Sequence, residues 1–170
     1  RLSGKRTLIS GMGRGAGGRF IAPIDIESDG IDLYVLDSVI GSIFKVDPYS
    51  GDRALVSGSD KGDGPNLSQP AVLAINHNEI FIADAGLDAI LALDLETGNR
   101  RIVFNTFFEV DPVILLPTGI ALDASGDIYV ADAIYNAVIR IEPSTNLYTI
   151  VSGGKVGEGP DIFSPRDLKM

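Results

Sequence analysis

Among the side chains of this 170-residue sequence that could do acid–base or metal chemistry, carboxylates at a fixed spacing stand out. Asp37, Asp84 and Asp132 follow one another at intervals of 47 and 48 residues. Carboxylates from several repeats could converge on one metal ion. Alternatively, each could accept backbone N–H groups in the loop that follows it, as an Asx-type lock. Because the same residue returns in every repeat, we expect the structural role, with a shared metal ring as the alternative.

Two other features could suggest a cofactor, and both are better explained by turns and loops. The single histidine, His77, lies in an Asn-His-Asn turn, and the sequence has no cysteine to join it as a metal ligand or to form a disulfide. The segment 13–18 matches Gly-x-Gly-x-x-Gly, but a dinucleotide site requires a helix after that loop, and a strand is expected here. The sequence therefore predicts no cofactor and no metal.

Charge and hydropathy exclude further classes of function. The formal net charge is −9, which disfavours binding to a nucleic-acid backbone. The longest apolar run, at 71–75, is far too short to span a membrane, so we expect no membrane insertion. The sequence begins with Arg1 rather than Met, which suggests a processed protein or a piece of one. An extracytoplasmic location, secreted or periplasmic, is therefore slightly favoured.

The elements that position these residues belong to a repeat of about 47 residues. Pro23, Pro70, Pro117 and Pro165 mark its register, with intervals of 47, 47 and 48 residues. Each repeat contains short segments rich in β-branched and aromatic residues, separated by turn residues. In the third repeat the predicted strands are 119–123, 128–132, 138–141 and 148–151. Four strands in a repeat of this length predict a β-propeller blade.

The second strand of each repeat carries the motif that suggests a family. The three segments read Asp-Leu-Tyr-Val-Leu-Asp, Asn-Glu-Ile-Phe-Ile-Ala-Asp and Asp-Ile-Tyr-Val-Ala-Asp, at 32–37, 78–84 and 127–132. Together with the Ile-x-x-Ile/Val-Asp/Glu strand that follows, they resemble NHL repeats over nearly all of residues 6–170. The resemblance implies an all-β, NHL-type β-propeller. It leaves function open, since such propellers include lyases, lactonase-like enzymes and binding scaffolds.

The repeat register divides the chain, read as a single propeller segment over 1–170, into complete and partial blades. We expect complete four-stranded blades at 23–58, 70–105 and 117–153. Residues 1–22 would supply the outer strand of a preceding blade and a loop, and 165–170 would begin the next inner strand. This organisation predicts an arc of a larger, six-bladed propeller that needs strands from another chain or from missing sequence. A subunit that closes by pairing with a copy of itself is the alternative.

One loop departs from its sisters and supplies the candidate binding residues. Glu109 and Asp111 stand where the other loops have glycine, and Phe107 and Phe108 have no counterpart. Aromatic side chains bordered by acids on a loop-rich face suit a protein or peptide partner. Packing of this apolar loop onto neighbouring blades is the alternative. The predicted function is a non-catalytic binding or scaffold propeller for a protein, peptide or glycan. A lyase or lactonase-like enzyme, with its metal-binding residues in blades not present here, is the alternative.

Overall fold

The computed structural model describes residues 7–105, 114–153, 157 and 163–168, and it contains three four-stranded β-sheets. Blade 1 consists of β1 (Pro23–Ser28), β2 (Leu33–Asp37), β3 (Ser42–Val46) and β4 (Arg53–Ser57). Blade 2 consists of β5 (Pro70–Asn76), β6 (Glu79–Asp84), β7 (Ala89–Asp94) and β8 (Arg100–Asn105). Blade 3 consists of β9 (Pro117–Leu122), β10 (Ile128–Asp132), β11 (Ala137–Glu142) and β12 (Leu147–Gly153).

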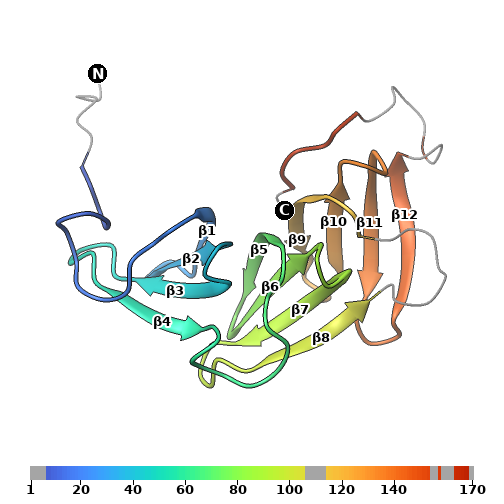
Figure 1. The fold of residues 1–170 in the computed structure, drawn as a ribbon. Coiled ribbons are helices and arrows are strands. Elements are labelled where there is room, and N and C mark those ends of the chain that lie inside the picture. The colour runs from blue at the N-terminus through green and yellow to red at the C-terminus, as the bar shows by residue number, and fades with distance from the viewer. Residues whose placement is uncertain (1–6, 106–113, 154–156, 158–162, 169–170) are drawn as a thin grey trace.

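Every sheet is an antiparallel meander in which each strand pairs with the next one in sequence. Each begins at one of the register prolines, where the missing N–H costs no ladder bond because proline is the first residue of the strand. The strands of the third repeat agree with the sequence prediction to within two residues at each end. The all-β, three-bladed arc expected from the repeat register is therefore confirmed (Figure 1).

The hydrophobic core lies between neighbouring sheets, as stacked blades require. One cluster joins Leu36 and Ile43 of blade 1 to Ile80 and Leu93 of blade 2. A second cluster joins blade 2 to blade 3, with Ile90 on one side and Ile128, Ile139 and Ile141 on the other. The inner strands β1, β5 and β9 also lie next to one another (Figure 1). Each blade thus buries its apolar faces only against its neighbours.

One edge of the arc gathers the beginnings of the first strands and the ends of the second strands. In each blade the register pairs the first proline with the last aspartate of the second strand, for example Pro23 with Asp37 and Pro70 with Asp84. We call this side, which carries Asp37, Asp84 and Asp132, the aspartate edge. The turns that join the first two strands, at 29–32, 77–78 and 123–127, lie at the opposite edge.

The two ends of the described chain do not form complete strands. Residues 7–10, expected as an outer strand, pair in no ladder with any described residue. Residues 163–168 pass beside β9, where the Asp167 N–H donates to the Thr118 carbonyl at 3.0 Å (Figure 1). A strand requires a ladder on at least one side, and neither segment has blade-mates in the described chain.

The described residues include no helix long and apolar enough to cross a membrane.

Candidate functional site

Each of the three repeating aspartates is fully buried and accepts four backbone N–H bonds. Asp37 accepts from Ile21 and Ala22 at 2.6 and 2.9 Å, and from Val39 and Ile40 at 3.2 and 3.1 Å. Asp84 receives bonds of 2.7–3.2 Å from the residues at the same repeat positions, Ser68, Gln69, Gly86 and Leu87. Asp132 receives bonds of 2.9–3.0 Å from Leu115, Leu116, Ile134 and Tyr135.

The sequence predicted only half of these bonds. The two N–H groups that follow each strand were expected, whereas the other two come from the residues just before the inner strand of the same blade. One carboxylate therefore fixes a hairpin turn to the end of an interblade loop. The four N–H groups occupy the roughly four acceptor positions of each carboxylate.

A second repeating feature, which sequence reasoning missed, joins the glycine-rich loops before blades 1 and 2 to the outer hairpins of those blades. Arg100 is buried, and its guanidinium donates to the Pro65 carbonyl at 2.7 Å and to the Ser57 hydroxyl. The neighbouring Asn99 side chain accepts the Asp63 N–H at 2.7 Å. Burial lowers the pKa of the Arg100 guanidinium. We call Asn99 and Arg100, with the acceptor Ser57, the polar anchor of the 58–69 loop.

The same polar anchor occurs one repeat earlier, on the 11–22 loop. Asp52 accepts the Ala16 N–H at 2.7 Å, and Arg53 donates to the Gly18 carbonyl and the Ser10 hydroxyl, both at 2.6 Å. The signal was present in the sequence, because Arg53 and Arg100 are also 47 residues apart.

The glycines in these loops are required by close approach of two backbones. A Cβ at Gly15 would lie 1.7 Å from the Gly51 carbonyl oxygen, and a Cβ at Gly62 would lie 1.9 Å from that of Gly98. Both glycines also have positive φ, at +77° and +81°. The loop and the outer hairpin are therefore in direct backbone contact at this point.

Blade 3 has different residues at the positions of the polar anchor. Allowing for the one-residue insertion in the turn before β10, Leu147 replaces Asp52 and Asn99, and Tyr148 replaces Arg53 and Arg100. Leu147 is 62 % exposed. Tyr148 packs edge-on against Phe104, with ring centroids 6.0 Å apart, and Phe104 replaces Ser57. An aromatic pair thus fills the place of the polar anchor between blades 2 and 3.

The loop that precedes blade 3 contains the predicted binding residues. Phe107, Phe108, Glu109 and Asp111 lie outside the described residues, so their prediction stands on the sequence alone. Of the apolar run that follows, Ile114 is buried in the core between blades 2 and 3, whereas Leu115 and Leu116 are 41 % and 47 % exposed.

Other side chains that could bind a metal ion are dispersed. His77 is exposed in a turn opposite the aspartate edge, with its Nδ1 beside the Asn76 side-chain oxygen. Asp25 accepts the Leu73 N–H at 2.8 Å and so joins β1 to β5. Asp123 caps its own turn, where bonds from Ser125 and from the Asp127 N–H lower the pKa of its carboxyl against the opposing effect of burial. Over the described ranges, no three His, Cys, Asp or Glu side chains are grouped as metal ligands would be.

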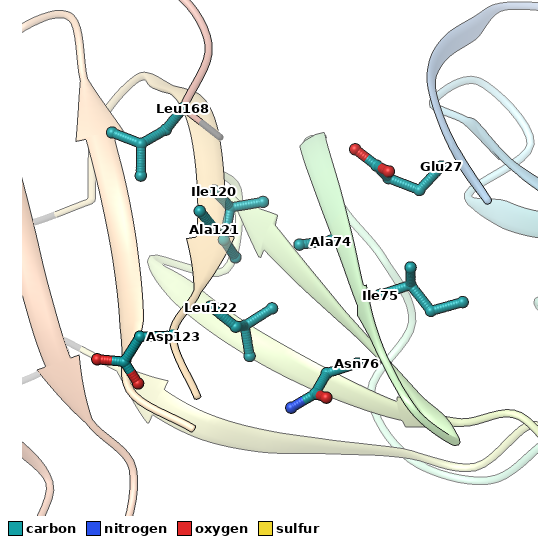
Figure 2. Close-up of a pocket in the computed structure, with 9 residues that line it drawn as sticks. All are labelled: Glu27, Ala74, Ile75, Asn76, Ile120, Ala121, Leu122, Asp123 and Leu168. Atoms are coloured by element: carbon teal, nitrogen blue, oxygen red, sulfur yellow. The ribbon is translucent and has the colours of Figure 1, made fainter. Parts of the chain in front are cut away.

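A cleft of about 230 Å³ lies along the inner strands, toward the edge opposite the aspartates (Figure 2). Its walls carry Glu27 from β1, Ala74–Asn76 from β5, and Ile120–Asp123 from β9 and its turn. Its lining is mainly aliphatic, and its two carboxylates stand on opposite walls (Figure 2).

A second cleft, of about 390 Å³, opens at the aspartate edge. Its apolar lining comes from Ala71 and Val72 of blade 2 and from Leu116, Pro117 and Ala133 of blade 3. Its polar groups are those of Thr118, Ser164 and Arg166. We call it the aspartate-edge cleft. Three successive repeats contribute to it, so it can bind a ligand only when the blades are stacked.

Comparison with known proteins places the fold. No family model matches the sequence, and no curated protein matches it. Solved structures do match. A chain in a crystal structure of a nidogen/laminin complex has a TM-score of 0.60 and 21 % identity, over 76 % of this chain and 48 % of that one. Streptogramin B lyase has a TM-score of 0.63 and 15 % identity, over 87 % of this chain and 44 % of that one.

A third match is a protein of unknown function from Bacteroides thetaiotaomicron, with a TM-score of 0.64 and 13 % identity, over 86 % of this chain and 41 % of that one. These similar structures are β-propellers. The present chain spans less than half of the length of each. At these identities the likeness shows the fold alone: three blades of a propeller.

Proposed function

We propose that this propeller is a non-catalytic binding module that takes a protein or peptide on its aspartate edge. The observation that carries the proposal is a set of exposed aliphatic and aromatic side chains at equivalent repeat positions. Ile21, Leu115 and Phe163 lie two residues before the register prolines Pro23, Pro117 and Pro165, and they are 66 %, 41 % and 78 % exposed. Val39 and Ile134 occupy the same position of the turn after the second strand and are 67 % and 55 % exposed. We call these five residues the apolar rim.

The fold itself does not need these side chains to be apolar. At four of the five positions the backbone N–H is bound by one of the buried aspartates, while the side chain faces solvent. Blade 2 forms the same turns with Ser68 and Gly86. Recurrent apolar exposure on one edge is typical of surfaces that bind other proteins.

The chemistry of the described residues supports binding over catalysis. The side chains of the buried aspartates and of the two anchor arginines already make hydrogen bonds that hold loops. They are Asp37, Asp84, Asp132, Arg53 and Arg100. Within the described chain, no buried side-chain nitrogen or oxygen lacks a hydrogen-bond partner. A catalytic site usually keeps a poised or strained polar group, and none stands out here.

The test uses peptides selected against the full-length protein from a random displayed library. Replacing Val39 and Ile134 together by serine removes apolar area that the partner would bury, so we expect selected peptides to bind at least about tenfold more weakly. Ile31→Ser is the matched control, since Ile31 is 75 % exposed at the opposite edge. All three positions are exposed, so the free energy of unfolding should change by less than about 0.5 kcal/mol. Equal binding by the double variant and the control would refute the aspartate edge as the binding surface.

Lyase-like catalysis is the alternative function, because two of the similar structures are a streptogramin B lyase and a virginiamycin B lyase from Staphylococcus aureus. Such an activity would have to use residues outside those described, since the described ones contain no cluster of potential metal ligands. Metal analysis of the full-length protein distinguishes the two functions. A stoichiometric bound metal ion would favour the enzyme.

We also infer that the propeller is of the NHL type. The three Asp-terminated segments that resemble NHL repeats coincide with β2, β6 and β10, each with one preceding residue, and each ends in a buried aspartate with four bonds. Strands from another chain, or from sequence beyond this one, would complete the ring.

A further inference from the structure

The aspartate-edge cleft combines an apolar lining with an arginine that has no counterion among the described residues. Arg166 is flanked by two hydrogen bonds to Thr118. The Thr118 hydroxyl donates to the Pro165 carbonyl, and the Asp167 N–H donates to the Thr118 carbonyl. These bonds fix the backbone on both sides of Arg166 against β9, at the mouth of the cleft.

The lack of a partner sets Arg166 apart from most other cations of the described chain. Arg101 and Arg140 pair with Glu79 and Asp127, and Lys45 pairs with Asp32. The remaining cations with a polar partner, Arg14, Arg53, Lys61 and Arg100, donate to carbonyl or hydroxyl oxygens. Within the described ranges only Arg19 and Arg166 have no recorded acceptor. A guanidinium beside an apolar cleft is suited to a carboxylate, which it can bind through two parallel N–H bonds.

We propose that the aspartate-edge cleft binds an aliphatic side chain of a peptide whose adjacent carboxylate pairs with Arg166. This assignment rests on the binding function proposed above and specifies the chemistry of the partner at one point of the rim. Val72, Leu116 and Ala133 form the apolar wall for the aliphatic group. The volume of about 390 Å³ lies within the range of about 300–1,000 Å³ that is usual for small-ligand sites.

A peptide is the occupant that the surroundings favour. Leu115 and Phe163 of the apolar rim are the chain neighbours of Leu116 and Ser164, which line the cleft. A chain that places one aliphatic residue in the cleft can therefore also bury its flanking residues on the rim. A small organic acid would use the cleft and leave the rim exposed.

The carboxylate could be an Asp or Glu side chain or the C-terminus of the peptide, and the test distinguishes these sources. Four dye-labelled Gly/Ser peptides serve as probes. Two are amidated and contain either Leu-Asp or Leu-Asn internally. Two end in Leu, either as the free acid or as the amide. Dissociation constants are measured by fluorescence anisotropy with the full-length protein, at low and high ionic strength.

We expect one carboxylate-bearing probe to bind about tenfold or more tightly than its neutral partner, with the difference reduced by salt. A preference for Leu-Asp over Leu-Asn assigns a side-chain carboxylate, and a preference for the free acid over the amide assigns a C-terminus. Arg166→Met removes the charge with similar side-chain bulk and should abolish the preference. Arg19→Met, the matched control at the other arginine without an acceptor, should retain it.

The inference is overturned if the carboxylate gives no advantage, or if Arg166→Met binds the probes as the unaltered protein does. In that case peptides selected from the library would still lose binding to the Val39/Ile134 double variant if the proposed function holds. Loss of both effects would refute both proposals. If the Val39/Ile134 double variant weakens binding but Arg166→Met has no effect, only the proposal for the aspartate-edge cleft is refuted.

Discussion

Blades 1 and 2 are joined in a chemically different way from blades 2 and 3. At the first junction Ser57, Asn99 and Arg100 form a polar network that holds the 58–69 loop against the outer hairpin of blade 2. At the second junction Phe104, Leu147 and Tyr148 take the same repeat positions. An edge-on aromatic pair there joins the sheets directly.

The comparison shows that the repeat keeps the positions at which neighbouring blades are joined, while the residue types at those positions change. A buried guanidinium with several acceptors and a pair of aromatic rings can occupy the same space between blades. The polar version also bonds an interblade loop, through Asn99 and Arg100. The loop before blade 3 has Glu109 and Asp111 at the two glycine positions, so its sequence departs from the pattern where the anchor residues also depart. The glycines of the loop and the residues of the polar anchor therefore change together in this repeat.

The first prediction breaks the aromatic junction. Phe104 is 4 % exposed, so Phe104→Ala leaves a cavity between blades 2 and 3 and should lower the free energy of unfolding by about 3–5 kcal/mol. Ser57→Ala, at the equivalent position, removes a hydroxyl from a network in which Arg100 keeps other acceptors, and should cost about 1–2 kcal/mol. Urea unfolding measures both. Equal costs would mean that the two junctions do not differ as described.

The second prediction tests the contact between loop and hairpin. Gly62→Ala places a Cβ 1.9 Å from a backbone oxygen and keeps an unfavourable positive φ, so it should cost about 2–3 kcal/mol. Gly13→Ala is the matched control. Its φ is also +81°, but no atom lies within 4 Å of the new Cβ, so only the conformational cost of about 1 kcal/mol remains. If the two variants unfold at the same urea concentration, the backbone contact does not determine the glycine.

The third prediction compares Asn99, which precedes Arg100, with Leu147, which has the equivalent position in blade 3. Asn99→Ala removes the acceptor of the Asp63 N–H and should cost about 1 kcal/mol. Leu147→Ala alters an exposed side chain and should change stability by less than about 0.5 kcal/mol. Hydrogen exchange provides the local measurement, since the Asp63 amide should lose protection in Asn99→Ala. Unchanged protection of Asp63 would show that Asn99 does not hold the loop.

Much of the fold could be read from the sequence because its determinants are local and recur. The prolines, the strand segments and the three aspartates all share one register, and the blades follow it. The polar anchors could have been found from Arg53 and Arg100 in the same way. What escaped sequence reasoning is geometry that residue spacing does not contain. The two extra N–H donors on each aspartate precede the first strand of the same blade, and the pairing of the first two strands brings them to the carboxylate. The approach of Gly62 to Gly98 and the aspartate-edge cleft join residues from two or three repeats, so they form only when the blades stack.

The last prediction concerns the aromatic residues of the loop before blade 3, and it should have the smallest effect on stability. The core between blades 2 and 3 is already filled by Ile114, Phe104 and their neighbours. Phe107 and Phe108 have no counterpart in the sister loops, so the repeat itself provides no place for them. If they serve binding, replacing both by alanine should weaken the binding of the selected peptides at least about tenfold, while changing the free energy of unfolding by less than about 0.5 kcal/mol.

Glu109→Gln with Asp111→Asn then tests the two acidic side chains, whose loss should weaken the binding of basic peptides more than that of neutral ones. A large fall in thermal stability, with unchanged binding per folded molecule, would instead assign the two phenylalanines to packing between blades. That result would add both phenylalanines to the packing between blades 2 and 3, and it would leave the apolar rim as the binding surface.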